Sequence, residues 1–369
     1  MSENTLSWPA QDKRLRLHII VNKEVNYINH SSDMKIKIKK NISILLLIMG
    51  FSCVGHAQQE VQFTQYMFNR LAINPGYAGS SGSICASVMY RNQWLGLDLS
   101  APAPGVEAGT TPVTYLFSFD APVKLLHGGL GLTLYADNIG YHSFVSGSFD
   151  YAFRIYWGPG NLSAAIEGNF YNTSLDYLQL KGSDDLTGQH TDPISSSGDP
   201  MLSGSANASD FMIDVSTGVY YQVPGSYYFG LSIKNLLASS SRTLNYQNSR
   251  VLYLLGGYDY VIPTNPSFRL KPSALIRTAN FSVFQFDLSC LLEYQNLLWG
   301  GVNFRYQESV SFLAGVTWDK LKFGLAYDLT VSKLSRLSFG SLEAYLRYCF
   351  KIVIPPKLPS VYQNTRYLL

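Results

Sequence analysis

The chain has 369 residues, of which 14% are charged and 14% are aromatic, with 26 Tyr and 20 Phe among the aromatic ones. Water-soluble domains carry roughly 25% charged residues, so this composition is unusual for a soluble protein. The formal net charge of +3 arises in the first 57 residues, which hold 8 of the 28 Lys and Arg but only 4 of the 25 Asp and Glu. The remaining residues have a net charge near −1, so the sequence does not suggest nucleic-acid binding.

The beginning of the chain has the pattern of a targeting signal. Four lysines between residues 35 and 40 precede an apolar stretch from Ile42 to Phe51, which is too short to span a bilayer. Gly55-His56-Ala57 then places small residues at the positions that a signal peptidase recognises, and we predict cleavage after Ala57. We therefore expect a signal peptide at 34–57. Residues 1–33 are polar and are not expected to belong to the native product.

From residue 83 onward, one pattern recurs about fourteen times: some ten residues of alternating apolar and polar side chains, closed by a turn rich in Gly, Pro, Asn, Asp or Ser. Successive side chains of a strand point to opposite faces, so one face of each strand is apolar. The strand length, the aromatic content and the alternation of long and short connections favour a transmembrane β-barrel over a soluble sandwich. We predict strands at 83–93, 112–122, 129–137, 144–157, 161–172, 211–223, 227–236, 250–262, 267–278, 282–294, 297–307, 309–318, 321–331 and 339–350.

The connections of such a barrel fall into two classes. Bacterial outer-membrane barrels have an even number of strands, short periplasmic turns and longer outer loops. The long connections expected to face outward are 95–111, 173–210, 237–249 and 332–338. Tight turns expected at the periplasmic end include 158–160, 224–226 and 319–320.

Alternation also predicts which side chains face the lipid and which face the lumen. Predicted lipid-facing residues include Phe149, Tyr151, Phe153, Ile155, Phe323, Leu325, Tyr327 and Leu329. Predicted lumen-facing residues include Asp150, Arg154, Glu167, Asp214, Lys234, Asp259, Arg277, Asp287, Arg305, Asp328, Glu343 and Arg347. Their charges are mixed in sign and balanced. This fits either a water-filled channel or a lumen crossed by salt bridges and packed by Tyr, and the second interpretation is preferred.

Three cysteines follow the predicted signal peptide, an odd number without the spacing of a metal site. A closed barrel pairs its first and last strands, so Cys85 and Cys349 are expected close together, near the periplasmic end and facing the lumen. Cys290 is expected on the lipid face. We do not expect a disulfide between the first two, because the stagger of a barrel separates strand ends and a disulfide needs a short Cα distance.

No catalytic motif is recognisable in the sequence. It contains no G-x-S-x-G, H-E-x-x-H, phosphate-binding loop or C-x-x-C. His190 lies among Asp184, Asp185 and Asp192 in a predicted outer loop, where a solvated acidic loop is favoured over a cation site. We therefore expect neither an enzyme nor a cofactor, and a lumenal enzyme is the weakest of the functional alternatives.

Two regions fall outside the strand pattern. In residues 58–82, apolar residues recur at helical spacing, at Phe63, Tyr66, Met67 and Leu71, before a turn at Asn74-Pro75-Gly76. This predicts a short amphipathic element that caps or enters the barrel of residues 83–350. The tail at 351–369 contains three prolines that prevent a strand or helix from continuing, so an extended periplasmic tail is expected.

Several motifs carry a resemblance to a known family. They are Phe63-Thr64-Gln65-Tyr66-Met67-Phe68-Asn69, Asn74-Pro75-Gly76-Tyr77-Ala78-Gly79, Tyr90-Arg91-Asn92-Gln93-Trp94, Gly129-Leu130-Gly131-Leu132, Asp137-Asn138-Ile139-Gly140, Tyr228-Phe229-Gly230-Leu231-Ser232, Leu270-Lys271-Pro272-Ser273 and Phe323-Gly324-Leu325-Ala326-Tyr327-Asp328. With them, nearly the whole mature chain resembles the PorP/SprF outer-membrane proteins of the type IX secretion system. The family-motif residues taken as candidates for interaction are Phe63, Gln65, Tyr66, Met67, Phe68, Asn69, Asn74, Pro75, Tyr77, Gly79, Tyr90, Arg91, Gln93 and Trp94.

The resemblance implies an all-β, fourteen-stranded barrel in the outer membrane of a Gram-negative bacterium. It implies a role in the secretion or surface anchoring of large adhesin-like proteins, often gliding adhesins, whose C-terminal domains are recognised. The implied partners are outer-membrane lipid, these cargo domains and secretion components on the periplasmic side, without nucleic acid. A passive porin or small-molecule transporter built on the same barrel is the alternative.

Overall fold

The computed structural model describes residues 62–96, 111–140, 142–176, 207–241, 244, 246–332, 335 and 338–351. All of them belong to one compact unit. The strands are β1 (Ser83–Asn92), β2 (Val113–Val123), β3 (Gly128–Ile139), β4 (His142–Trp157), β5 (Gly160–Asp176), β6 (Asn207–Val223), β7 (Tyr227–Lys234), β8 (Val251–Tyr258), β9 (Tyr260–Val261), β10 (Phe268–Ala279), β11 (Val283–Tyr294), β12 (Leu298–Arg305), β13 (Ser309–Trp318), β14 (Leu321–Thr330) and β15 (Ser341–Lys351). Two short 3₁₀ helices, η1 (Pro75–Tyr77) and η2 (Lys124–Leu126), complete the regular elements.

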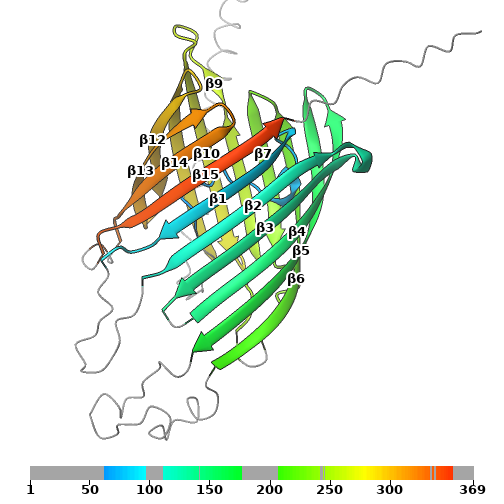
Figure 1. Ribbon diagram of the computed structural model, residues 1–369, viewed down its shortest axis with the longest axis vertical. Coiled ribbons are helices and arrows are strands. Elements are labelled where there is room, and N and C mark those ends of the chain that lie inside the picture. Colours follow the sequence, from blue (N-terminus) through cyan, green and yellow to red (C-terminus); the bar gives the residue numbers. More distant parts are fainter. Residues whose placement is uncertain are drawn as a thin grey trace, which may run out of the picture. The chain divides into compact units, whose positions relative to one another are not determined.

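The strands form one closed antiparallel barrel (Figure 1). Apart from β8 and β9, which both pair with β10, each strand pairs with its neighbours in sequence, and β1 pairs with β15 to close the barrel. Because β8 and β9 both pair with β10 and are separated only by Asp259, they act as one strand. The described part of the chain is therefore a fourteen-stranded barrel, as the sequence predicted.

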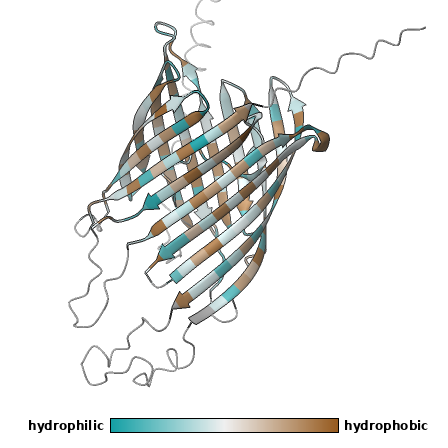
Figure 2. Ribbon diagram, viewed as in Figure 1, coloured by the Kyte–Doolittle hydropathy of each residue, from teal (hydrophilic) through white to brown (hydrophobic). Residues whose placement is uncertain are grey.

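The barrel wall follows the alternation of the sequence (Figure 2). The predicted lipid-facing side chains are on the outer surface, with Phe149 63% and Phe153 49% exposed in the isolated chain. The predicted lumen-facing charges lie inside, where Glu167 and Asp328 are 1% exposed. Exposed aromatic residues ring the end where β1 begins and β15 stops: Tyr156, Trp157, Tyr227, Tyr258, Tyr260, Tyr294, Trp318, Tyr348 and Phe350. An apolar belt edged by aromatic residues is the surface expected of a barrel in a bilayer.

The two ends of the barrel differ in their connections. We call the end with the start of β1 and the end of β15 the terminal end, and the opposite end the loop end. The described connections at the terminal end are short, with two residues between β4 and β5 and two between β13 and β14. The long connections predicted from the sequence all lie at the loop end.

One predicted boundary was wrong. The predicted loop at 173–210 is shorter at both ends, because β5 and β6 continue in register from Thr173 opposite Asp210 to Asp176 opposite Asn207. These extensions are polar, so they lack the apolar alternation that marks a strand. Backbone pairing with the neighbouring strand extends them without that signal. The acidic cluster around His190 lies outside the described residues.

No helix in the described ranges is both long and apolar enough to cross a bilayer. The helical spacing of apolar residues ahead of β1 also does not produce an α-helix. Residues 62–82 form consecutive turns, with backbone hydrogen bonds such as Phe68 N–H to Gln65 O and Asn74 N–H to Arg70 O, and then η1. Other backbone groups, such as Thr64 N–H and the Ile73 carbonyl, bond to side chains of the barrel wall instead of following the repeating pattern of a helix.

Candidate functional site in the barrel lumen

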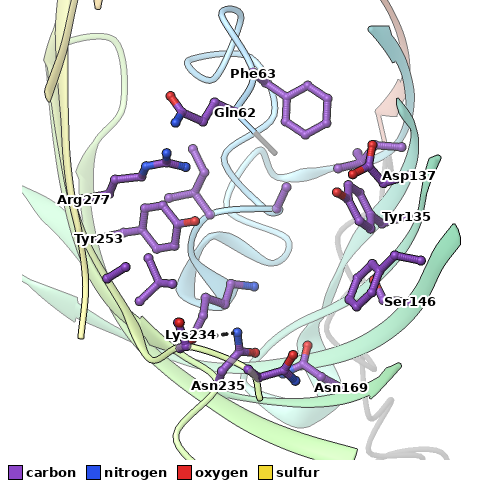
Figure 3. A pocket seen from close by; sticks show the side chains of 18 of the residues that line it. Gln62, Phe63, Tyr135, Asp137, Ser146, Asn169, Lys234, Asn235, Tyr253 and Arg277 are labelled. Atoms are coloured by element: carbon purple, nitrogen blue, oxygen red, sulfur yellow. Dashed lines mark hydrogen bonds between the residues drawn. The ribbon is translucent and has the colours of Figure 1, made fainter. Parts of the chain in front are cut away.

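Residues 62–82, called here the lumenal segment, lie inside the barrel (Figure 3). Tyr66, Met67 and Leu71 are 1–5% exposed and share one apolar core with wall residues such as Leu255 and Trp299. The segment runs from the loop end to the terminal end before β1 turns back along the wall. This burial satisfies apolar side chains that an aqueous tail would leave in water.

At the loop end, the segment is held by a buried ionic group that we call the loop-end network: Thr64, Arg91, Asp328 and Glu343. The backbone N–H groups of Thr64 and Gln65 donate to the two Glu343 carboxylate oxygens at 2.8 Å each. The Thr64 hydroxyl lies 2.8 and 2.9 Å from the Asp328 carboxylate oxygens. Arg91 bridges both carboxylates, at 2.7 Å from Asp328 and 3.1 Å from Glu343.

The loop-end network unites motifs that are far apart in the sequence. Thr64 belongs to the opening run, Arg91 to the run that ends β1, and Asp328 to the run within β14. All three side chains are at most 2% exposed. Burying charged groups is costly unless they are paired and hydrogen-bonded, and here every charge meets an opposite charge.

A second ionic chain continues along the wall next to this network. Arg305 lies 2.9 Å from Asp287 and 3.2 Å from Glu308. Glu308 accepts from Gln285, which also receives a hydrogen bond from Gln62 of the lumenal segment. Burial raises the pKa of the Glu308 carboxyl. The Arg305 guanidinium, the hydrogen bond from Gln285 and the charges of Arg91 and Arg277 together outweigh burial and hold that pKa below its usual value. The lumen-facing charges named here are thus paired in salt bridges, which agrees with the preferred interpretation of the lumen.

Halfway along the lumen, hydrogen bonds connect the segment to the barrel wall. The Ser232 hydroxyl donates to the Ile73 carbonyl at 2.7 Å, and the Asn74 amide donates to the Val219 carbonyl at 3.0 Å. The Asn74 side-chain oxygen also accepts from Gly76 N–H at 2.8 Å and so caps η1. These polar groups therefore find partners although they are removed from water.

The cation of Arg70 is accommodated by aromatic rings in the same region. Its guanidinium donates to the Tyr220 hydroxyl at 2.9 Å and lies 3.6 Å from the centre of the Tyr228 ring. Such cation–π contacts stabilise a cation that is shielded from water. Tyr66 is held by a hydrogen bond, with its hydroxyl 3.2 Å from Ser273 Oγ.

Glycines on the wall make room for the segment. A Cβ atom at Gly129 would lie 2.1 Å from the Ala78 carbonyl oxygen, and one at Gly218 would lie 2.4 Å from the Asn74 side-chain oxygen. Real Cβ atoms do not approach other atoms this closely, so only glycine leaves the space. The barrel wall therefore leaves space for the segment and also supplies its hydrogen-bond partners.

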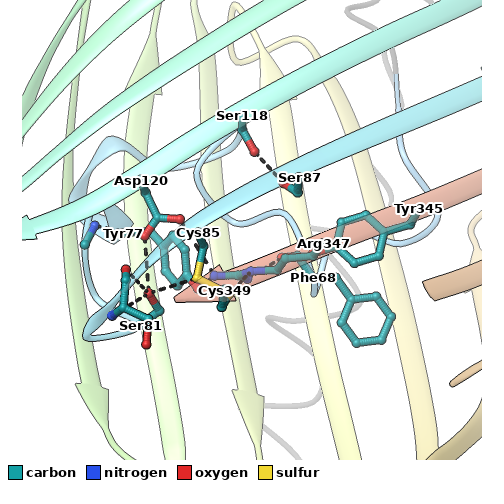
Figure 4. Close-up of a disulfide and its surroundings, with 12 residues drawn as sticks. Phe68, Tyr77, Ser81, Cys85, Ser87, Ser118, Asp120, Tyr345, Arg347 and Cys349 are labelled. Carbon is teal, nitrogen blue, oxygen red and sulfur yellow. Dashed lines mark hydrogen bonds and ion pairs between the residues drawn. A yellow bond between two sulfur atoms is a disulfide. The ribbon is translucent and has the colours of Figure 1, made fainter. Parts of the chain in front are cut away.

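Toward the terminal end, two arginines donate hydrogen bonds to the segment, and Figure 4 shows one of them, Arg347, between Tyr77 and Phe68. Arg347 donates to the Phe68 carbonyl and to the Tyr77 hydroxyl, both at 3.1 Å. Arg154 donates to the Ala78 carbonyl at 2.7 Å and to the Gly79 carbonyl at 3.0 Å. The positive side chains therefore replace the solvent around backbone carbonyls that face the lumen.

A disulfide closes the barrel beside these arginines (Figure 4). Cys85 in β1 and Cys349 in β15 are direct partners in the register, with 4.1 Å between their Cα atoms. Their predicted proximity is confirmed, but the expectation that they would not bond was wrong. The register at the seam sets the two residues opposite each other, so no stagger separates them. Cys290 is free and exposed on the outer surface, as predicted.

Beside the first half of the segment lies a cavity of about 790 Å³, called here the loop-end cavity (Figure 3). The segment residues that border it are Gln62, Phe63, Tyr66, Asn69, Ala72 and Ile73. Arg277 and Tyr253 point into it from one wall and Asp137 and Tyr135 from the opposite wall (Figure 3). A pocket of a few hundred cubic ångström with aromatic and convergent polar groups has the size and chemistry of a binding site.

The structure distributes the candidate interaction residues unevenly. Residues from the opening run that are buried among the wall contacts are Gln65, Tyr66, Met67, Asn69, Asn74, Pro75, Tyr77 and Gly79, with Phe68 half-buried against Trp299. Phe63 borders the loop-end cavity. Tyr90 faces outward against Tyr115, and the backbone of Trp94 bonds to the Ser341 side chain. Most of these residues therefore make internal contacts, and a role in binding a partner stays a prediction.

Sequence reasoning did not single out the wall residues that hold the segment. For Arg154 and Arg347, alternation along the strand predicted only that the side chains face the lumen. Ser232 and Gly218 received no role. Polar or glycine residues at inward strand positions were the available signal. No group of three or more His, Cys, Asp and Glu in the described residues could hold a metal ion.

Comparison with known proteins decides the family. The model of the type IX secretion system membrane protein PorP/SprF matches residues 55–348, which is most of the chain. This chain belongs to the PorP/SprF family. It is an outer-membrane β-barrel of the type IX secretion system, and its family consists of membrane components and not of enzymes. The resemblance seen in the sequence motifs is confirmed.

Several solved barrels resemble the chain distantly. The Omp33 outer membrane protein of Acinetobacter baumannii is 6% identical, with a TM-score of 0.38 over 73% of this chain and 99% of that one. The CymD monoaromatic hydrocarbon channel is 11% identical, with a TM-score of 0.44 over 79% of this chain and 94% of that one. The NanC porin is 7% identical, with a TM-score of 0.32 over 73% and 100%. No curated protein sequence matches the chain.

Proposed function

We propose that this PorP/SprF barrel supports the secretion or surface anchoring of large adhesin-like cargo by recognising protein segments, and that it does not act as a conducting pore. Family membership supports the link to type IX secretion. The observation that carries the proposal is the lumenal segment, which is bound along its length by the loop-end network, Ser232, Arg347 and Arg154. A barrel that fills its lumen with its own chain offers surfaces and pockets to partners instead of a wide aqueous path.

The organisation of the native product is part of this proposal. We place the signal peptide at 34–57, so that the mature chain starts at residue 58. The tail at 351–369 would meet secretion components on the periplasmic side, and the loop end would meet cargo. N-terminal sequencing of the protein purified from outer membranes tests the cleavage site.

The rival function is a passive porin or small-molecule transporter. Reconstitution of the purified barrel in planar bilayers separates the two proposals. A scaffold with a bound lumenal segment is expected to give little conductance. Steady open-channel steps from the intact protein would favour the rival, because a porin conducts whenever it is inserted.

The role of the loop end is tested in cells. Long loops on a rigid scaffold often carry function, and the connection between β5 and β6 is the longest at this end. Replacing residues 177–206 by a short Gly/Ser linker is expected to leave the barrel folded, as judged by heat-modifiable migration in gels, and to reduce cargo at the cell surface. Unchanged surface cargo in a folded variant would remove this loop from the mechanism.

A further inference from the structure

The loop-end cavity is a second feature of the lumen. It is bordered by the lumenal segment between Gln62 and Ile73, by β1 to β5, β7, β8, β10 and β11, and by the connection residues Tyr246–Ser249. Its volume of about 790 Å³ falls within the range of roughly 300–1,000 Å³ that is typical of ligand pockets. The cavity therefore has room for several residues of a bound chain.

The chemistry of the cavity wall suits a peptide backbone. Of the described residues that line it, eight carry side-chain amides: Gln62, Asn69, Asn169, Asn235, Gln247, Asn248, Asn280 and Gln285. An amide offers a donor and an acceptor side by side, as a peptide unit does. Most of these amides also bond within the protein, as Asn169 does to Ser216 Oγ at 2.7 Å, which fixes their orientation at the cavity wall. Acidic and basic groups are close to balance, since the Glu167 carboxylate is paired with the Lys234 ammonium. This wall favours a ligand that is polar along its length and has little net charge.

An aromatic row supplies the apolar part of the site. The ring centre of Phe144 lies 5.8 Å from that of Tyr135 and 5.4 Å from that of Tyr171. Tyr135 reaches the cavity from β3, while Phe144 and Tyr171 reach it from β4 and β5. The rings are tilted or edge-on to one another, and together they provide an apolar surface for a side chain of the ligand next to the amides that would bind its backbone.

The same lumen already binds a peptide in this manner. The lumenal segment is irregular, and wall side chains form hydrogen bonds with its backbone: Ser232 with Ile73, Arg347 with Phe68, and Glu343 with Thr64 and Gln65. The loop-end cavity adjoins the start of that segment at Gln62 and Phe63. One barrel interior thus contains a filled peptide site and a neighbouring cavity of the same chemical kind.

We propose that the loop-end cavity binds an extended peptide segment of a partner protein, with an apolar or aromatic side chain against the aromatic row. The partner would be a secreted protein, and this identification rests on the proposed function. The strands of the wall already fix the binding groups, so less ordering is needed on binding. The peptide would enter from the loop end, because the lumenal segment occupies the lumen below.

The test uses the full-length protein in nanodiscs and a displayed library of random linear hexapeptides. Ser146 points into the cavity (Figure 3), so Ser146→Trp fills it. Val145, the next residue, is 51% exposed on the outer surface, so Val145→Trp is a matched control. Enriched peptides are expected to bind the native protein and V145W equally, and S146W at least about tenfold more weakly by calorimetry.

A second variant covers the case in which S146W fails to fold. Asn169→Leu keeps the size of a buried side chain that borders the cavity and removes its amide. It is also expected to weaken peptide binding about tenfold while heat-modifiable migration in gels stays unchanged. Maltooligosaccharides are tested in parallel as polar ligands that are not peptides. Two results would overturn the inference: no peptide enriched on the native protein over S146W, or binding of the maltooligosaccharides alone.

This outcome is separable from the proposed function. If S146W loses peptide binding and cargo stays at the cell surface, the cavity is a peptide site and its partner is not the cargo. If peptide binding is absent while the loop deletion still releases cargo, the proposed function stands and the inference about the cavity is wrong.

Discussion

At Arg91, one side chain holds three motifs together. Its guanidinium bridges the carboxylates of Asp328 and Glu343, which also accept hydrogen bonds from the hydroxyl and backbone groups of the lumenal segment. Arg91→Ala would leave two buried carboxylates without their cation, and breaking a buried pair in this way typically costs roughly 3–5 kcal/mol. We expect a clearly lower unfolding temperature in detergent. Arg250→Ala, at an exposed arginine, is the control and is expected to change little.

Gly218 provides a test of the fit between wall and segment. Gly218→Ala would bring a Cβ within 2.4 Å of the Asn74 side-chain oxygen, so the segment or the strand must shift. Overpacking of this kind costs about 1–3 kcal/mol. Gly168→Ala on the neighbouring strand β5 meets nothing within 4 Å and serves as the control. Equal unfolding temperatures for the two variants would show that the segment is not tightly held there.

The lumenal segment as an element is predicted to stabilise the barrel and to close it. Deleting residues 58–74 removes Met67, Leu71 and Ile73 from the core, and burying each such side chain is worth roughly 1.5–3 kcal/mol. It also leaves the buried carboxylates without the backbone donors of Thr64 and Gln65. We expect a lower unfolding temperature and, in the barrels that still insert, new ion conductance in planar bilayers.

Both readouts of this deletion bear on the fold. A deletion variant with wild-type heat stability and normal surface cargo would contradict a structural role for the segment. A stable variant without conductance would show that other parts of the chain close the lumen.

For the whole barrel, the seam between β1 and β15 is predicted to depend on the Cys85–Cys349 disulfide. The bond links residues 264 apart in sequence, and native disulfides typically contribute 2–5 kcal/mol, roughly, to stability. The double variant C85S/C349S, or the native protein with reductant, is expected to unfold at a lower temperature in gel assays. Denatured native protein should also migrate faster without reductant, since the cross-link keeps the chain compact.

Cys290 gives the matched control for the seam. It is free and exposed on the outer surface, so C290S is expected to behave as the native protein with and without reductant. Identical unfolding of the native protein in both conditions would mean that strand pairing alone closes the barrel.

The sequence alone determined the barrel, its strand order, the facing of its side chains and the family. Each of these depends on local alternation or on a contiguous motif, as at Phe149 and Asp150, which point to opposite faces. Only the tertiary structure decided that Thr64, Arg91 and Asp328 form one network, and that Cys85 and Cys349 are bonded. Inward parity says that a side chain enters the lumen, but the partner it meets depends on strand register and barrel closure. These are set by pairing between residues more than two hundred positions apart.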